Sequence, residues 1–275
     1  MEISIPINNE IHLNIRDHVI REGRFPTSRL QKGFLLFHHG EDLSAEAVGF
    51  GVPVIKCGLH TIFPGGVELS AIRQDKGYQV DALYLLNLEE KTLGVKDGKT
   101  LSGFLNQGKL LASAFIRHFP WLRKSLMGLS KLLRSTFHWK TEYQVSAMSF
   151  RIPVHYLFQK KRMAVSIDLS GVKDDRITEI VVMNEQGAGY FSNYRDSSGK
   201  EIQENEIGCW DEVKAPEATF FDPKRKISFS LKQILSARLF HGLEMDDSRL
   251  AWSGFGYTFS PRRIEFKYTL KIGDD

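Results

Sequence analysis

Two adjacent histidines follow a short apolar run, and their side chains could carry out chemistry. The run ends at Phe37 and is followed by His38, His39 and Gly40. Imidazole nitrogens bind metal ions and exchange protons near neutral pH, so the pair is a candidate for either role. Neighbouring residues of a strand point to opposite faces, so the two rings can meet only where a loop redirects one of them. A polar turn that closes a strand is the structural alternative.

A second candidate lies near the C-terminus, where Glu244 follows His241 after two residues. A histidine and a carboxylate can together act as the general acid and the general base in a reaction on a sugar or a similar polyol. Carboxylates on loops also bind calcium, but the spacing of Asp246 and Asp247 matches no specific calcium loop, and a solvated turn is the alternative. We assign no metal ligand and no cofactor. The candidate catalytic residues are His38, His39, His60, His241 and Glu244.

Aromatic residues gather in the C-terminal third of the chain. Exposed rings on a sheet provide the surface on which a sugar ring can stack, although most of these rings are expected to pack in the core. The candidates for ligand contact, including two nearby arginines, are Trp210, Trp252, Tyr194, Arg195 and Arg249.

The middle of the chain is basic. Residues 98–141 contain no Asp or Glu but eight Lys and Arg, whereas the whole chain carries a net charge of only +4. Within 106–137, apolar residues recur at spacings of three and four, which predicts a helical segment that Pro120 interrupts. Such a segment favours an anionic partner, and a solvated helix face is the alternative. The candidate anion-binding residues are Arg117, Arg123, Lys124, Lys131 and Arg134.

Elsewhere, apolar and polar residues alternate, which is typical of half-buried strands. One such stripe runs from Tyr78 to Leu88 and another from Ile264 to Ile272, while Asn8 begins a turn between two shorter stripes. Turns recur without intervening helices, which argues against a doubly wound α/β fold. The sequence therefore predicts a mainly β protein, a large antiparallel β-sandwich that could take the supersandwich form. We expect a single domain over 1–275, with the helical insertion at 106–137.

The sequence also indicates the cellular compartment of this domain. Cys57 and Cys209 are the only cysteines, and the first residues lack the basic and apolar segments of a signal peptide. No apolar run reaches the roughly 18 residues of a membrane helix. These observations predict a cytoplasmic location, with peripheral membrane contact left open.

Taken together, the candidates favour a carbohydrate-active or carbohydrate-binding β-sandwich protein. This inference is an analogy, since many large β-sandwich proteins handle carbohydrate. The fold alone does not determine the function. The alternative is a non-catalytic module that docks an anionic surface, a lipid or a partner through the basic segment. Nucleic acid is not expected as a partner, and the sequence leaves the oligomeric state and any catalysis open.

Overall fold

The computed structural model describes residues 1–17, 33–45, 47–57, 60–74, 77–94, 140–208, 210–245 and 251–274. The chain divides into two compact units. The first comprises 1–87 and 149–275, and the second comprises 88–148. The sites whose geometry is described below lie within the first unit. The predicted helical insertion at 106–137 lies outside the described residues.

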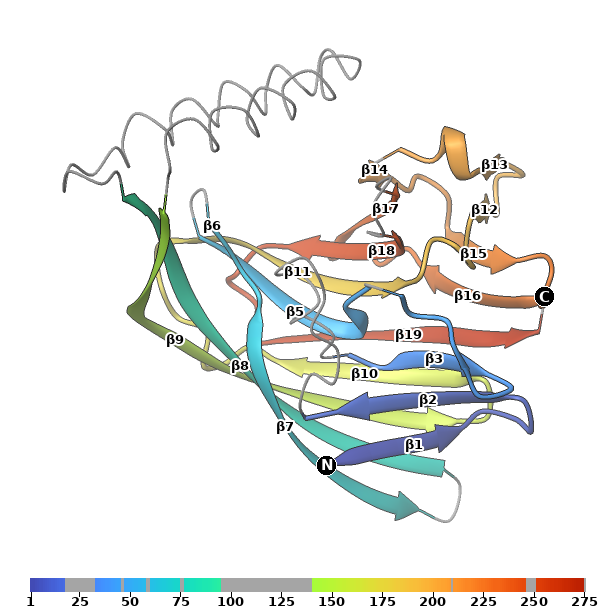
Figure 1. Ribbon diagram of the computed structural model, residues 1–275, viewed down its shortest axis with the longest axis horizontal. Coiled ribbons are helices and arrows are strands. Elements are labelled where there is room, and N and C mark those ends of the chain that lie inside the picture. Colours follow the sequence, from blue (N-terminus) through green and yellow to red (C-terminus); the bar gives the residue numbers. More distant parts are fainter. Residues whose placement is uncertain are drawn as a thin grey trace. The chain divides into compact units, whose positions relative to one another are not determined.

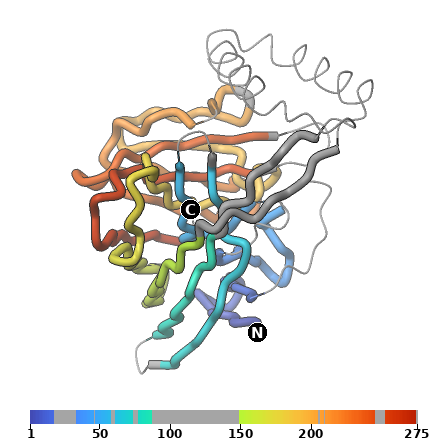
Figure 2. The backbone as a smooth tube through the Cα atoms, turned by 90° about the vertical axis from the view of Figure 1, so that its left-hand side faces the viewer, coloured from blue at the N-terminus to red at the C-terminus, as the bar shows by residue number. Residues whose placement is uncertain are grey.

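The largest sheet has nine strands, and each neighbouring pair with a described register is antiparallel. Figures 1 and 2 both show β7 and β8 running side by side at one edge of it. The order across the sheet is β13 (Glu201–Gln203), β12 (Asn193–Asp196), β15 (Glu217–Asp222), β16 (Ile227–Lys232), β19 (Glu265–Asp274), β10 (Arg162–Asp168), β9 (Lys140–Gln159), β8 (Gly77–Gly94) and β7 (Pro64–Gln74).

A six-stranded and a four-stranded sheet complete the described strands (Figure 1). A short 3₁₀ turn, Glu204–Glu206, follows β13. The six-stranded order is β14 (Asp211–Glu212), β17 (Arg238–Met245), β18 (Ala251–Phe259), β11 (Ile177–Gln186), β5 (Gly49–Cys57) and β6 (His60–Ile62). The four-stranded order is β1 (Glu2–Pro6), β2 (Ile11–Arg16), β3 (Leu35–His38) and β4 (Glu41–Asp42).

The core lies between the nine-stranded and six-stranded sheets, where aromatic rings from both meet. Phe229 of β16 lies against Phe50 of β5, with ring centroids 5.1 Å apart. Phe220 of β15 packs edge-on against Phe255 of β18 at 4.9 Å. Face-to-face packing of two antiparallel sheets through their apolar faces is the arrangement of a β-sandwich. The predicted fold class is therefore confirmed at that level, while its supersandwich form and single-domain extent stay predictions.

The alternation in the sequence determines which side chains enter this core. Val80, Ala82 and Tyr84 of β8 are buried, as are Phe266 and Tyr268 of β19. The residues between them project from the opposite face of the sheet, because side chains of a strand alternate. The same rule that builds the core therefore gathers polar residues on the outer face.

Buried hydroxyls connect the two sheets across this core. Tyr84 Oη lies 2.7 Å from Tyr156 Oη, and Tyr156 Oη donates to the Gly51 carbonyl at 2.9 Å. Gly51 has φ +79°, and a β-carbon there would lie 2.5 Å from the Tyr156 ring. This close approach requires glycine, so Gly51 and Tyr156 fix how β5 and β9 face each other.

Among the described residues, no helix is long and apolar enough to cross a membrane.

Candidate functional site

An open hollow of about 610 Å³ lies over the outer face of the nine-stranded sheet. Four adjacent strands, β8, β9, β10 and β19, form its floor (Figure 1). Ligand pockets in proteins commonly measure about 300–1,000 Å³, so the hollow has room for a small molecule. Its side chains on the outer face of the strands are Gln79, His155, Leu157, Ala164, Ser166, Lys267 and Thr269.

Strand register arranges these side chains in two rows. Ser166 of β10 pairs with His155 of β9 on one side and with Lys267 of β19 on the other. Two residues along β10, Ala164 pairs in the same way with Leu157 and Thr269. Directly paired residues have β-carbons about 5 Å apart, so each row is continuous across three strands. A polar row thus lies beside a row that is mainly apolar.

Two carboxylates hold the polar side chains of the hollow. His155 Nδ1 lies 2.7 Å from Asp81 Oδ1, and Gln79 Nε2 donates to the same oxygen at 3.2 Å. The bond to Asp81 orients the imidazole and leaves Nε2 on the other side of the ring, as in histidines positioned for proton transfer.

The second carboxylate belongs to Glu265 at the other end of the polar row. Its Oε1 accepts from Ser166 Oγ at 3.1 Å and lies 2.8 Å from Lys267 Nζ. The bond from Lys267 holds the pKa of the Glu265 carboxyl below its usual value. The hollow therefore presents an imidazole, an amide, an ammonium group and hydroxyls beside a small apolar strip, and the two carboxylates hold several of these polar groups in place.

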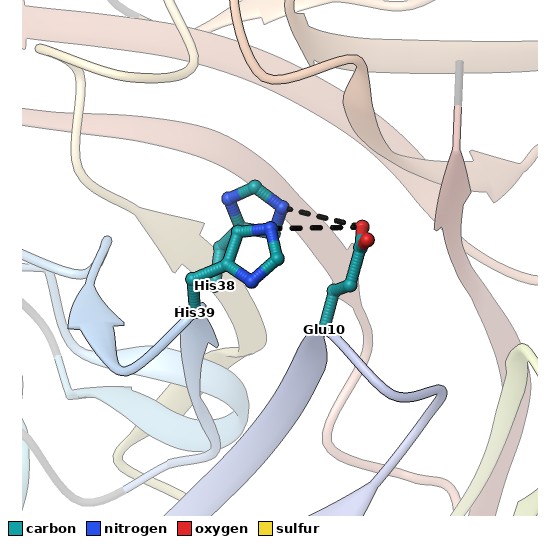
Figure 3. Close-up of side chains that lie close together, drawn as sticks. All are labelled: Glu10, His38 and His39. Carbon is teal, nitrogen blue, oxygen red and sulfur yellow. Dashed lines mark ion pairs between the residues drawn. The ribbon is translucent and has the colours of Figure 1, made fainter.

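His38 and His39 meet a third residue, Glu10, at the edge of the four-stranded sheet (Figure 3). Each imidazole Nε2 lies 3.8 Å from Glu10 Oε2. His38 ends β3, whereas His39 and Gly40 form the two-residue turn to β4, with φ values of +47° and +81°. Positive φ at both central residues is the signature of a type I′ hairpin turn. This turn redirects His39, so the two rings share one side of the sheet edge.

The structure does not bring His241 and Glu244 together. They lie three positions apart on β17, so their side chains leave opposite faces of the strand. His241 is buried in the core, where its ring stacks on Tyr194 at 4.1 Å. Within the described part of the chain, its Nδ1 has no hydrogen-bond partner. Burial lowers the pKa of His241 to about 4, so the ring is neutral near pH 7.

The candidate aromatic residues divide between the core and the outside of the six-stranded sheet. Tyr194 is buried, and Arg195 beside it places its guanidinium 4.8 Å from the Phe221 ring. Trp210 and Trp252 are half-buried and stack on each other at 5.1 Å with an interplanar angle of 27°. Trp252 lies on the opposite face of β18 from the core residue Phe255 because their positions differ by three. The half-buried tryptophan pair is thus an aromatic surface outside the core, on a different sheet from the hollow.

The remaining candidates lie wholly or partly outside the described residues. His60 begins β6, but its side chain is not among those described. Arg249 and the five candidate anion-binding residues of the basic segment, Arg117, Arg123, Lys124, Lys131 and Arg134, also lie outside. Their proposed roles stay predictions.

Sequence reasoning missed the residues of the hollow. His155 and Asp81 occupy the polar phase of two alternating stripes, and that phase is the signal that could have placed them on an outer face. Their contact joins residues 74 positions apart. It depends on which strands pair and in what register, which the stripes alone do not specify.

The sequence matches no family model and no curated protein. Among solved structures, the α-N-acetylgalactosaminidase NagBb from Bifidobacterium bifidum resembles the whole chain, with a TM-score of 0.51 at 8% identity. An α-mannosidase from Enterococcus faecalis gives 0.46 at 10% identity, also over the whole chain. A galactose mutarotase-like protein from Lactobacillus casei gives 0.41 at 9% identity, covering 99% of each chain.

The chain spans 36% of the first of these proteins and 30% of the second. At these identities the likeness to NagBb shows a shared β-sandwich fold.

Proposed function

We propose that this chain binds a carbohydrate in the hollow on the outer face of the nine-stranded sheet. The observation that carries the proposal is the polar row of His155, Ser166 and Lys267, bounded by the carboxylates of Asp81 and Glu265. A sugar presents hydroxyls that both donate and accept hydrogen bonds. The row supplies a charged donor in Lys267 and, in His155 and Ser166, groups that can donate or accept. Bonds from a charged donor are the stronger kind.

The neighbouring row suits the other property of a sugar ring. Leu157 and Ala164 are half-buried and offer a small apolar strip beside the polar groups. The C–H face of a pyranose could cover this strip while its hydroxyls reach the polar row. Pockets that combine an apolar surface with a few convergent polar groups are the usual form of small-molecule sites.

The shape of the hollow favours binding to a mono- or disaccharide over burial of a large ligand. The hollow is open, and among the described residues no Phe, Tyr or Trp ring belongs to its outward side chains. Affinity therefore depends mainly on hydrogen bonds, each of which gains little over water. We expect dissociation constants in the millimolar to high micromolar range for a single sugar unit, corresponding to about 4–5.5 kcal/mol.

A panel of neutral, acidic and amino sugars tests the proposal by calorimetric titration. Lys267→Ala should weaken sugar binding by about tenfold or more, because it removes a charge-assisted bond of roughly 1.5–3 kcal/mol. His155→Ala should weaken it several-fold, because it removes a hydrogen bond of roughly 0.5–1.5 kcal/mol. His12→Ala is a matched control on β2 of the four-stranded sheet and should bind as the wild type does. If no sugar binds, the proposal is wrong.

The stacked tryptophans provide the sharpest internal alternative. Trp252→Ala removes half of the Trp210–Trp252 pair without touching the hollow. If this variant loses the sugar while His155→Ala keeps it, the carbohydrate binds on the six-stranded sheet instead. Carbohydrate turnover, the cytoplasmic location and the anionic-surface alternative stay predictions.

A further inference from the structure

We propose that Glu10, His38 and His39 form a binding site for a divalent zinc ion. One ligand atom from each of the three residues can be chosen so that all lie within 4.8 Å of one another. Figure 3 shows the two imidazole rings and the carboxylate close together. His38 comes from the end of β3, His39 from the turn after it and Glu10 from the turn before β2. This site is independent of the hollow and of the proposed carbohydrate binding.

The separations between the ligand atoms are close to those of a zinc centre. With zinc–ligand distances of about 2.0–2.1 Å, the edge of a tetrahedron is about 3.3 Å. Each Nε2 of His38 and His39 lies 3.8 Å from Glu10 Oε2. Each of these two pairs must therefore close by about half an ångström around an ion. The ligand atoms all lie within 4.8 Å of one another, so the two histidine nitrogens must close by at most about 1.5 Å, which rotation of the exposed Glu10 and His39 side chains can supply.

Two turns hold these side chains in place through their backbones. The His39 amide donates to the Glu10 carbonyl at 2.9 Å, which joins the β3–β4 turn to the β1–β2 turn. Asn8 Oδ1 accepts from the amides of Glu10 and Ile11 at 2.8 and 2.6 Å, which fixes the conformation of the first turn. The ligands are thus brought together by main-chain bonds, and an ion would add to a geometry that already exists.

The donor set favours zinc over calcium or magnesium. Imidazole nitrogen is a borderline ligand that suits zinc, and zinc also accepts a carboxylate oxygen, whereas calcium and magnesium prefer oxygen alone. Three protein ligands leave a fourth tetrahedral position. The side chains of Glu10 and His39 are 57% and 63% exposed, so water can reach that position, while His38 at 13% anchors the site in the sheet.

The competing explanation is an ordinary surface ion pair. A protonated histidine near a carboxylate would give the same proximity without any metal, and exposed pairs of this kind contribute little. The two explanations differ in a measurable way, because an ion pair does not take up one equivalent of metal. They also differ in the effect of Glu10→Gln, which keeps the size of the side chain but replaces the anionic ligand with a poor one.

The test is a titration of the full-length, tag-free protein, stripped with chelator, with ZnCl₂ by calorimetry and with CoCl₂ by visible absorption. We expect one zinc per chain and the intense absorption of four-coordinate cobalt. His39→Ala and Glu10→Gln should each weaken zinc binding at least tenfold and remove the cobalt band. Because both residues are exposed, these variants should keep the wild-type circular dichroism spectrum.

His155→Ala is the matched control, since its ring also contacts a carboxylate but lies in the nine-stranded sheet. It should bind zinc as the wild type does. The proposal is overturned if the stripped wild type takes up no stoichiometric zinc. It is also overturned if His39→Ala and Glu10→Gln bind zinc as tightly as the control, since the ion would then sit elsewhere.

Discussion

The two faces of the sandwich use histidine in opposite ways. His241 lies inside, stacked on Tyr194 at 4.1 Å, with no hydrogen-bond partner for Nδ1 in the described part of the chain. His155 lies outside, half-exposed, with Nδ1 2.7 Å from the Asp81 carboxylate. The interior histidine serves as a flat, neutral packing group. The exterior one is oriented by a charge and can meet a ligand.

This difference teaches that the face of the strand decides what a histidine can do. Burial disfavours the charged imidazolium, which keeps His241 neutral inside the core. Proximity in sequence to Glu244 made His241 a candidate for acid–base chemistry. The alternation of β17 instead places the two side chains on opposite faces, and only the pairing of β8 with β9 gives His155 its carboxylate.

The largest expected effect is acid destabilisation through His241. Its pKa in the folded chain is lowered from 6.5 to about 4 by burial. As the pH falls from 6.5 to 4, the unfolded chain therefore takes up a proton while the folded chain does not. The free energy of unfolding keeps its full value above pH 6.5 and is about 3 kcal/mol lower below pH 4.

Urea unfolding at several pH values measures this loss. His241→Phe keeps a flat ring against Tyr194 but cannot take up a proton. Acid should therefore lower the free energy of unfolding of this variant by about 3 kcal/mol less than that of the wild type. Equal acid sensitivity of wild type and His241→Phe would mean that the interior imidazole is not held neutral.

A second interior group should give an effect of opposite sign. Glu185 of β11 is buried, and burial raises the pKa of its carboxyl from 4.5 to about 7. Between these values the unfolded chain loses a proton that the folded chain keeps, so stability falls as the pH rises. Glu185→Gln removes the charge and retains an oxygen that can accept from the Val48 amide.

We expect Glu185→Gln to stabilise the protein by roughly 2–3 kcal/mol at pH 8 and to have little effect near pH 4. Thermal or urea unfolding of both proteins at the two pH values measures it. A variant that is less stable than the wild type at pH 8 would show that the carboxylate is compensated by a partner.

The smallest expected effect is on the outer face. Ser166→Ala and Lys267→Ala remove exposed contacts with Glu265, and surface changes of this kind usually alter stability by about 0.5 kcal/mol or less. Sugar affinity should fall while the unfolding free energy stays the same. If either variant lowered the free energy of unfolding by several kcal/mol, the polar row would serve to stabilise the fold and not to bind a ligand.

The sequence predicted the sandwich but only part of its chemistry. Period-two stripes such as Val80 to Leu86 are local, and burial of one face follows from them directly. The meeting of Glu10 with His38 and His39 depends on left-handed turn residues and on which turns are neighbours. The hollow depends on the register of β9, β10 and β19, which tertiary packing sets and no single segment encodes.

The most direct test of the account is to follow the histidine rings by NMR during titration with the best-binding sugar. Two-dimensional ¹⁵N spectra resolve each imidazole, and His155→Ala and His241→Phe assign the two signals. The account predicts that the His155 signals shift saturably with the sugar while those of His241 stay fixed. Saturable binding that leaves His155 unmoved would contradict it, because the ligand would then lie outside the hollow.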